Sequence, residues 1–280
     1  MHLVIQGADI ETRDLKALAK LSGAGAIDRL SDTAFRLTRA QPATGIAELC
    51  AGAKLDHGFV PEGRRLTDFK LLVMDMDSTL ITMETIDELA DMVGIKAEVA
   101  AITAQAMRGE IEYDESLRRR LALLKGLDES ALQRVYDERL RFSPGAERLL
   151  EKIRAAGIKT LLVSGGFTYI TERLQTRIKL DYTHSNVLEM KNGKLTGAVV
   201  GEIVNADVKR DALLRVATDL GISRTQIAGI GDGANDLKFL AECGVSVAYR
   251  AKPVVRGQTT YALNHSGLDA MLCLLSAEQS

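Results

Sequence analysis

Four apolar runs, each followed by a stretch of helical periodicity, constrain the fold of this chain most strongly. They occupy residues 70–74, 160–163, 226–230 and 245–248. Strands that alternate with helices pair in parallel, and a strand buried on both faces is apolar throughout rather than at every second residue. We therefore predict an α/β domain over residues 66–280, with a parallel sheet that helices cover on both faces.

Residues 1–65 show a different pattern. Short apolar or mixed runs at 2–6, 34–38 and near Phe59 are interleaved with helical stretches at 12–21 and 45–53. The order fits β-α-β-β-α-β and predicts a small α+β domain. The stretch 60–65 carries turn residues and charges with little to bury, so we expect it to link the two domains.

Two insertions interrupt the alternation of the larger domain. Residues 85–142 contain several helical stretches, including 98–107 and 115–125, which is too long for a simple crossover. An all-helical insertion there would lie above the carboxyl ends of the strands and could act as a lid. The second insertion, 187–204, contains Asn192-Gly193 between β-compatible runs, which predicts a β-hairpin with a structural role.

Composition excludes several functional classes. The formal charge of −2 arises from 36 basic and 38 acidic residues spread along the chain, so no strong positive field would attract nucleic acid or anionic lipid. No apolar run reaches the roughly 18 residues of a membrane span, and the N-terminus lacks the features of a signal peptide. Three widely spaced cysteines favour a reducing compartment. We expect a cytoplasmic protein without nucleic-acid or membrane partners.

Two carboxylates, Asp75 and Asp77, directly follow the first buried strand of the larger domain. Open α/β sheets bind their ligands at this edge, on the loops after the strands. An isolated Asp-x-Asp could equally cap the next helix. Its meaning therefore depends on the motifs that accompany it.

Three further motifs occur at equivalent places. Ser164-Gly165-Gly166 follows the second strand, where a hydroxyl and close backbone N–H groups could hold phosphate oxygens. Lys209 opens a helix, a position unfavourable for a cation unless it binds an anion. The turn that follows the next strand, Gly231-Asp232-Gly233-Ala234-Asn235-Asp236, offers oxygen ligands that suit Mg²⁺. Each motif alone could be an ordinary turn or a solvated side chain, but their joint occurrence favours a phosphate site.

This set resembles the haloacid dehalogenase (HAD) superfamily over residues 67–275. The stretches DMDSTLITMETIDELA, SLRRRLALLKG, VSGGF and GDGAND are most similar to the phosphoserine phosphatase family within it. The resemblance implies a Rossmannoid sheet with a helical cap over about 85–142. It also implies Mg²⁺-dependent hydrolysis of O-phosphoserine through an aspartyl-phosphate, the last step of serine biosynthesis. Residues 1–65 resemble ACT-like regulatory modules, from which neither a ligand nor a role follows.

The resemblance assigns the chemistry to two aspartates. Asp75 is the implied nucleophile, and Asp77 is the implied general acid and then general base. The implied Mg²⁺ ligands are the carboxylates of Asp75 and Asp232 and the backbone carbonyl of Asp77. Asp236 would support the metal shell.

The resemblance also assigns the binding groups. Ser164, the Gly165 backbone, Lys209 and Asn235 would hold the phosphate. Glu84 would bind the substrate ammonium and Arg120 its carboxylate. Tyr113 falls where the family commonly has an aromatic, often Phe, in the cap wall. Neither it nor Met107 on the preceding helix is included among the expected site residues.

Two alternatives remain open. The first is a HAD phosphatase or phosphotransferase that acts on another small phosphorylated amino acid, because Glu84 and Arg120 do not specify one side chain. The second is a serine-binding regulatory module in which the N-terminal domain carries the function and the core is silent. An exposed sheet edge in that domain could pair two chains, so a homodimer is also considered.

Overall fold

The computed structural model describes residues 1–277 and separates into two compact units. The first unit consists of Met1–Leu72, Ser143–Lys159 and the chain from Leu220 onward, and the second consists of Val73–Phe142 and Thr160–Asp219. None of the helices within residues 1–277 is both long and apolar enough to cross a bilayer.

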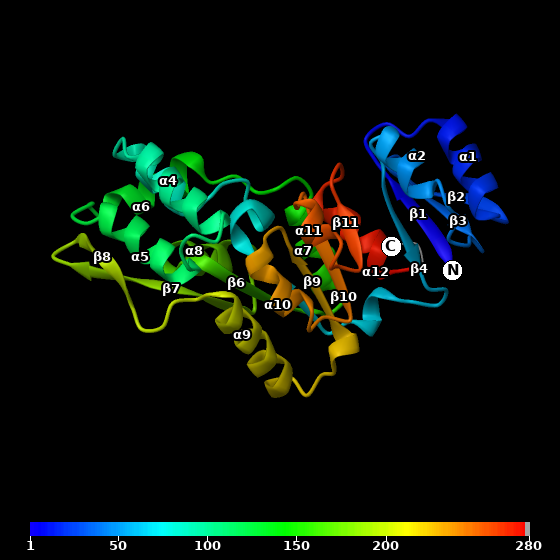
Figure 1. Ribbon diagram of the computed structural model, residues 1–280. Helices are drawn as coiled ribbons and strands as arrows, with labels where there is room; N and C mark the ends of the chain where they lie inside the picture. Colours follow the sequence, from blue (N-terminus) through cyan, green and yellow to red (C-terminus); the bar gives the residue numbers. More distant parts are fainter. Residues whose placement is uncertain (278–280) are drawn as a thin grey trace. The chain divides into compact units, whose positions relative to one another are not determined.

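A small antiparallel sheet with two helices forms the N-terminal part of the first unit (Figure 1). Its elements are β1 (His2–Gln6), α1 (Thr12–Ser22), β2 (Ala26–Ser31), β3 (Ala34–Thr38), α2 (Ile46–Gly52) and β4 (Asp56–Val60), with the strands in the order β2-β3-β1-β4. The predicted β-α-β-β-α-β order is confirmed, and an ACT-like domain is consistent with it. Strand β2 had no predicted bounds, because its side chains are exposed or half-buried and include Asp28 and Arg29.

Alternation along β1 decides which face of this sheet is buried against the helices. Leu3 and Ile5 point to the side of α1 and α2, where they pack with Leu15, Leu18 and Ile46 in one core cluster. Leu15 and Leu18 lie three residues apart on α1 and so present one apolar stripe. Burying such side chains stabilises the domain by about 1.5–3 kcal/mol each.

A seven-stranded sheet contains all four of the strands predicted after residue 66. Its strands are β5 (Leu71–Met74), β6 (Lys159–Phe167), β7 (Tyr182–Lys191), β8 (Lys194–Val200), β9 (Ile227–Gly231), β10 (Val245–Tyr249) and β11 (Tyr261–Leu263), in the order β11-β10-β9-β5-β6-β7-β8. The pairs β9–β10, β10–β11 and β6–β7 are parallel, and β7–β8 is antiparallel. Strand β5 is buried along its whole length, as its apolar sequence predicts. Strand β11 was not predicted, since it is only three residues long.

The remaining elements of the first unit flank its strands. They are α7 (Ala146–Ala155), α10 (Leu237–Leu240), α11 (Pro253–Arg256), α12 (Met271–Leu275) and single 3-10 turns at Leu66–Asp68, Arg224–Gln226, Ala234–Asp236 and Leu268–Ala270. The amphipathic helix α7 buries Leu149, Leu150 and Ile153 on one side.

The second unit contains the predicted helical insertion. Its helices are α3 (Thr85–Met92), α4 (Lys96–Met107), α5 (Tyr113–Leu123), α6 (Ser130–Arg134), α8 (Thr168–Ile178) and α9 (Ala206–Asp219), with helical turns at Met76–Leu80 and Val135–Arg139. The stretches predicted at 98–107 and 115–125 correspond to α4 and α5. We call residues 85–142 the cap.

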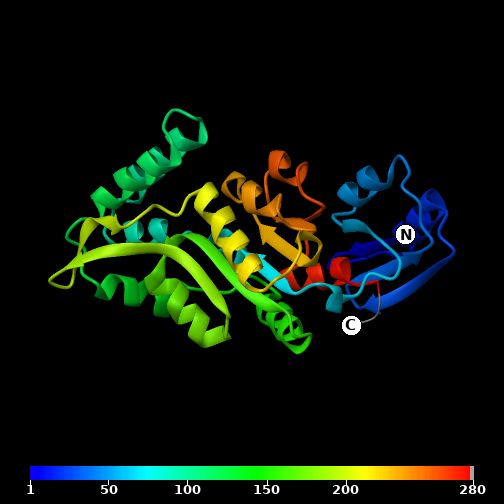
Figure 2. The ribbon, with the colours of Figure 1, turned by 90° about the horizontal axis from the view of Figure 1, so that it is seen from below.

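The predicted hairpin supports the cap. Strands β7 and β8 form a long ribbon joined at Asn192-Gly193, both of which have positive φ, as a tight hairpin turn requires (Figure 2). On β8, Gly197 lies so close to α5 that a Cβ there would come within 3.2 Å of Ala122. The ribbon and α5 therefore pack almost backbone to backbone.

A buried carboxylate joins β4 to the chain segment after β11. Asp56 accepts hydrogen bonds from the backbone N–H groups of Asn264, His265 and Ser266 at 2.7–3.3 Å. In the expected linker, Arg64 donates to the hydroxyl of Tyr261. The N-terminal sheet is therefore fastened to the segment 261–266 of the same unit by charge-assisted hydrogen bonds.

We expect Asp56→Ala to lower the free energy of unfolding by about 2–4 kcal/mol, because three buried N–H groups lose their acceptor. Urea denaturation followed by circular dichroism measures the change. Asp32→Ala is the matched control, since the Asp32 side chain is 92% exposed and its loss should cost less than about 0.5 kcal/mol. Equal effects of the two substitutions would contradict the role given to Asp56.

Candidate active site

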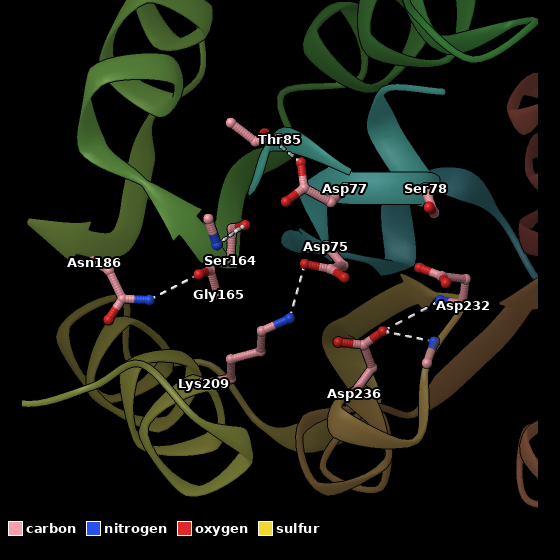
Figure 3. A network of polar contacts seen from close by, with 12 residues as sticks. Asp75, Asp77, Ser78, Thr85, Ser164, Gly165, Asn186, Lys209, Asp232 and Asp236 are labelled. Carbon is pink, nitrogen blue, oxygen red and sulfur yellow. Dashed lines mark hydrogen bonds and ion pairs between the residues drawn. The ribbon is translucent and has the colours of Figure 1, made fainter. Parts of the chain in front are cut away.

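The loop after β5 places the first two carboxylates. Asp75 follows Met74 directly and is buried, and Asp77 lies in the turn that comes next. Ser78 turns the chain with a φ of 57°, a left-handed conformation that few non-glycine residues adopt. Figure 3 shows both carboxylates at this end of the strand, where Asp75 contacts Lys209 and Asp77 contacts Thr85.

Asp75 pairs with Lys209 across the second unit. Lys209 Nζ lies 2.8 Å from Asp75 Oδ1, and the side chains are 1% and 7% exposed for the lysine and the aspartate. Lys209 comes from the first turn of α9. Two charges this deeply buried are tolerated only where each compensates the other. The helix start that looked unfavourable for a cation thus delivers the lysine to a carboxylate.

Asp77 has a different environment. The Thr85 hydroxyl donates to its Oδ1 at 2.7 Å. Burial, and next the negative charge of Glu84, raise the pKa of Asp77 to about 8, against the smaller opposing effect of the hydrogen bond from Thr85. The raised pKa favours the protonated form of Asp77, whereas Asp75 faces a cation. Sequence reasoning missed Thr85, because a threonine at a helix start is usually only a cap.

The end of β6 brings two glycines close to these carboxylates. The Gly166 N–H donates to Ser164 Oγ at 2.9 Å, and a Cβ on Gly166 would lie 2.6 Å from Met76 Cε and 3.1 Å from Asp77 Oδ2. Only glycine leaves that space open. Ser164 itself is buried.

Asn186 fixes the β6 end from the neighbouring strand β7. Its Nδ2 donates to the Gly165 carbonyl at 2.8 Å, and its Oδ1 accepts from the Val204 N–H at 2.9 Å. Both ends of the amide are therefore used to hold backbone. Asn186 was not predicted, since an asparagine within a strand carries no motif of its own.

Of the two expected amino-acid ligands, Arg120 lies in the cap and Glu84 directly precedes it. Glu84 immediately precedes α3 and accepts from the Ser78 hydroxyl at 2.6 Å. Arg120 on α5 is 9% exposed, and its Nε donates to the Ser116 carbonyl at 3.3 Å. No ion pair of Arg120 is found within residues 1–277. The positive charge of Arg120 acts to lower the pKa of Glu84 and of Asp87, so these carboxylates influence it without forming an ion pair. A buried guanidinium that lacks a direct ion pair is suited to an anionic ligand.

The turn after β9, in the first unit, holds the remaining predicted residues. Asp236 Oδ2 accepts from the backbone N–H groups of Asp232 at 3.2 Å and Gly233 at 3.0 Å (Figure 3). Asp236 is fully buried, and a Cβ on Gly231 would come within 2.6 Å of its Oδ2. Asp236 thus organises the backbone of the loop that carries Asp232 and Asn235.

Three buried or half-buried aspartates, Asp75, Asp232 and Asp236, could each supply an oxygen ligand to a metal ion. The donor set consists of hard oxygen atoms only, which fits a cation such as Mg²⁺ or Ca²⁺ better than a transition metal that prefers nitrogen or sulfur.

Comparison with known proteins shows that the chain is similar to one family of hydrolases. The family model for haloacid dehalogenase-like hydrolases matches residues 69–244, and a model for a domain of unknown function matches residues 3–44. A phosphoserine phosphatase of Polaromonas sp. is 54% identical over 216 residues, which are 75% of this chain and 92% of that protein.

Solved structures extend the similarity to the whole chain. A HAD family hydrolase of Salmonella enterica serovar Typhi has a TM-score of 0.89 at 32% identity, with 99% of this chain and 98% of that one covered. An unliganded probable phosphoserine phosphatase of Vibrio cholerae has a TM-score of 0.86 at 34% identity, with 99% and 86% covered.

We expect Lys209→Met to lower the free energy of unfolding of the metal-free protein by about 3–5 kcal/mol, because Asp75 loses its buried counter-charge. Chemical denaturation in the presence of a chelator measures it. Lys191→Met, on the exposed hairpin of the same unit, is the matched control and should change stability little. A loss no larger than that of the control would show that Lys209 does not hold the buried charge.

Proposed function

Because the chain belongs to the haloacid dehalogenase-like hydrolases, we propose that it is a phosphoserine phosphatase, which hydrolyses O-phosphoserine to serine and phosphate. One observation carries the chemistry. Two carboxyl groups two residues apart have neighbours that favour opposite protonation states, since Asp75 pairs with Lys209 while burial raises the pKa of Asp77 to about 8. A nucleophile and a general acid require this difference.

The first half-reaction uses both groups. A carboxylate oxygen of Asp75 attacks phosphorus, the bond between phosphorus and the serine oxygen breaks, and Asp77 gives its proton to that departing oxygen. An aspartyl-phosphate and free serine result. In the second half-reaction a water molecule attacks phosphorus and Asp77 takes its proton. Phosphate leaves, and the Asp75 carboxylate is regenerated.

The proposed cofactor is Mg²⁺, held by the carboxylates of Asp75 and Asp232 and the backbone carbonyl of Asp77. The all-oxygen donor set supports this assignment. When bound, the cation neutralises negative charge where an anionic nucleophile meets a phosphate. Asp236 supports the site by holding the N–H groups of Asp232 and Gly233.

Four groups are proposed to bind the transferring phosphoryl oxygens. They are the Ser164 hydroxyl, the Gly165 N–H, the Lys209 ammonium and the Asn235 amide. Lys209 would serve two purposes, because it both compensates Asp75 and presents a positive charge to the phosphate. Asn186 would keep Gly165 in place through its hydrogen bond to that carbonyl.

Substrate recognition is proposed to lie in the cap and at Glu84, the residue directly before it. Arg120, buried and without an ion pair among residues 1–277, would bind the substrate carboxylate, and Glu84 would bind the ammonium. Another small phosphorylated amino acid remains the alternative substrate, since neither residue contacts the part of the substrate that differs between amino acids.

We also propose that the protein forms a homodimer and is cytoplasmic. In the cytoplasm the free thiols of Cys50, Cys243 and Cys273 would stay reduced.

We expect the protein to release phosphate from L-phosphoserine only with Mg²⁺, and Asp75→Asn to lower the turnover number by more than about 10³-fold, since an amide cannot act as the nucleophile. Asp137→Asn, at an exposed position, is the control. Phosphothreonine and a sugar phosphate are compared in the same assay. Activity confined to one of these would keep the mechanism and discard the substrate, and an active Asp75→Asn would discard the nucleophile.

We expect Glu84→Gln and Arg120→Ala each to lower kcat/KM for phosphoserine by about 10–100-fold, the range of one charge-assisted hydrogen-bonded pair. Turnover of p-nitrophenyl phosphate, which lacks both charges, should change much less. Glu115→Gln and Arg119→Ala are matched controls, because these residues form an exposed pair on the same helix. Equal losses on both substrates would remove the recognition roles.

A further inference from the structure

The Tyr113 side chain reaches from the cap to the end of β6. Tyr113 is the first residue of α5, and its hydroxyl lies where a Cβ of Gly165 would stand, so that any side chain at residue 165 would collide with it. Gly165 does not have a positive φ, so backbone conformation does not require glycine there. The close approach of Tyr113 is therefore a separate reason for that glycine.

The hydroxyl lies among the charged groups of the proposed active site. Burial raises the pKa of Tyr113 and is the largest cause of its shift. The positive charges of Lys209 and then Arg120 act to lower that pKa, and the negative charges of Asp75 and Asp77 act to raise it. The raised pKa leaves the O–H group protonated at neutral pH, so it can donate. Tyr113 is half-buried, and no hydrogen bond from its hydroxyl is found within residues 1–277.

Helix geometry relates Tyr113 to the carboxylate ligand proposed above. Tyr113 and Arg120 are seven residues apart on α5, which is about two turns, so both project from one face of the helix. One rigid element can thus present a hydroxyl near Gly165 and a guanidinium further along the same substrate.

We propose that the Tyr113 hydroxyl donates a hydrogen bond to the phosphoryl group of the substrate above Gly165, so that the cap itself contacts the group being transferred. This inference rests on the proposed function. It assigns Tyr113 to the phosphoryl side of the substrate, because the hydroxyl lies over Gly165 and Lys209 is the charge that influences it most. Arg120 and Glu84 serve the amino-acid side.

The first test compares Tyr113→Phe with the unaltered protein. We expect kcat/KM to fall by about tenfold, the equivalent of one hydrogen bond to a charged group, on phosphoserine and p-nitrophenyl phosphate alike. The inhibition constant of inorganic phosphate should rise by a similar factor. Tyr169→Phe is the matched control, since its hydroxyl donates to Gln133 elsewhere in the unit.

A loss on phosphoserine alone, or no loss on either substrate, would overturn the assignment. Because p-nitrophenyl phosphate and inorganic phosphate report on the phosphoryl site by themselves, the result can be read even if phosphoserine is not the substrate. Failure of the proposed substrate and failure of the Tyr113 contact are therefore distinguishable.

The second test uses the collision between the two residues. Gly165→Ala should lower kcat/KM by about 100-fold, since the added methyl group displaces the Tyr113 hydroxyl. Combining it with Tyr113→Phe should restore activity to about tenfold below the unaltered protein, because a Cβ lies 3.3 Å from the ring carbon that bore the hydroxyl. A double variant no more active than Gly165→Ala would contradict the close approach.

Discussion

The buried ion pair between Asp75 and Lys209 is the interaction on which the site depends. Taking two charges out of water costs several kcal/mol per ion, and well-packed apolar residues would often be at least as stable. Lys209 also stands in the first turn of α9, where the helix dipole disfavours a cation. Stability alone does not account for such a pair. A site that must bind an anion beside an ionised carboxylate does account for it.

The same strand end supports two carboxyl groups with different surroundings. Asp75 is next to a buried ammonium, whereas Asp77 has a hydroxyl from Thr85 and the negative charge of Glu84 as neighbours. The difference arises from surroundings rather than from residue type, because both are aspartates separated by one residue. The turn after β5, with Ser78 in a left-handed conformation, directs the two side chains to these separate surroundings.

Sequence predicted the buried parts of the fold better than its margins. The four core strands are continuous apolar runs, and burial on both faces is the only simple reason for such a run. The bounds of β2 and the whole of β11 were not predicted, because β2 is polar and half-exposed and β11 has only three residues. In the site, the motifs predict roles for Asp75, Asp77, Ser164, Lys209 and Asp232, and these roles stay predictions. The sequence did not predict roles for Thr85 and Asn186, because neither residue belongs to a motif. Thr85 donates to the Asp77 carboxylate, and Asn186 holds backbone groups rather than substrate.

In the proposed function, bond breaking and substrate recognition would draw on different elements of the second unit. Asp75, Ser164 and Lys209 come from strand ends and a helix start around the sheet, where backbone hydrogen bonds fix their positions. Arg120 comes from the cap and Glu84 directly precedes it. The cap helices α3, α4 and α5 pack mainly on one another and on β8. Changes in the cap could therefore alter which ester is bound while the phosphoryl chemistry stays intact. Tyr113 would be the exception, because it extends the cap into the phosphoryl site and makes the chemical step sensitive to the position of α5.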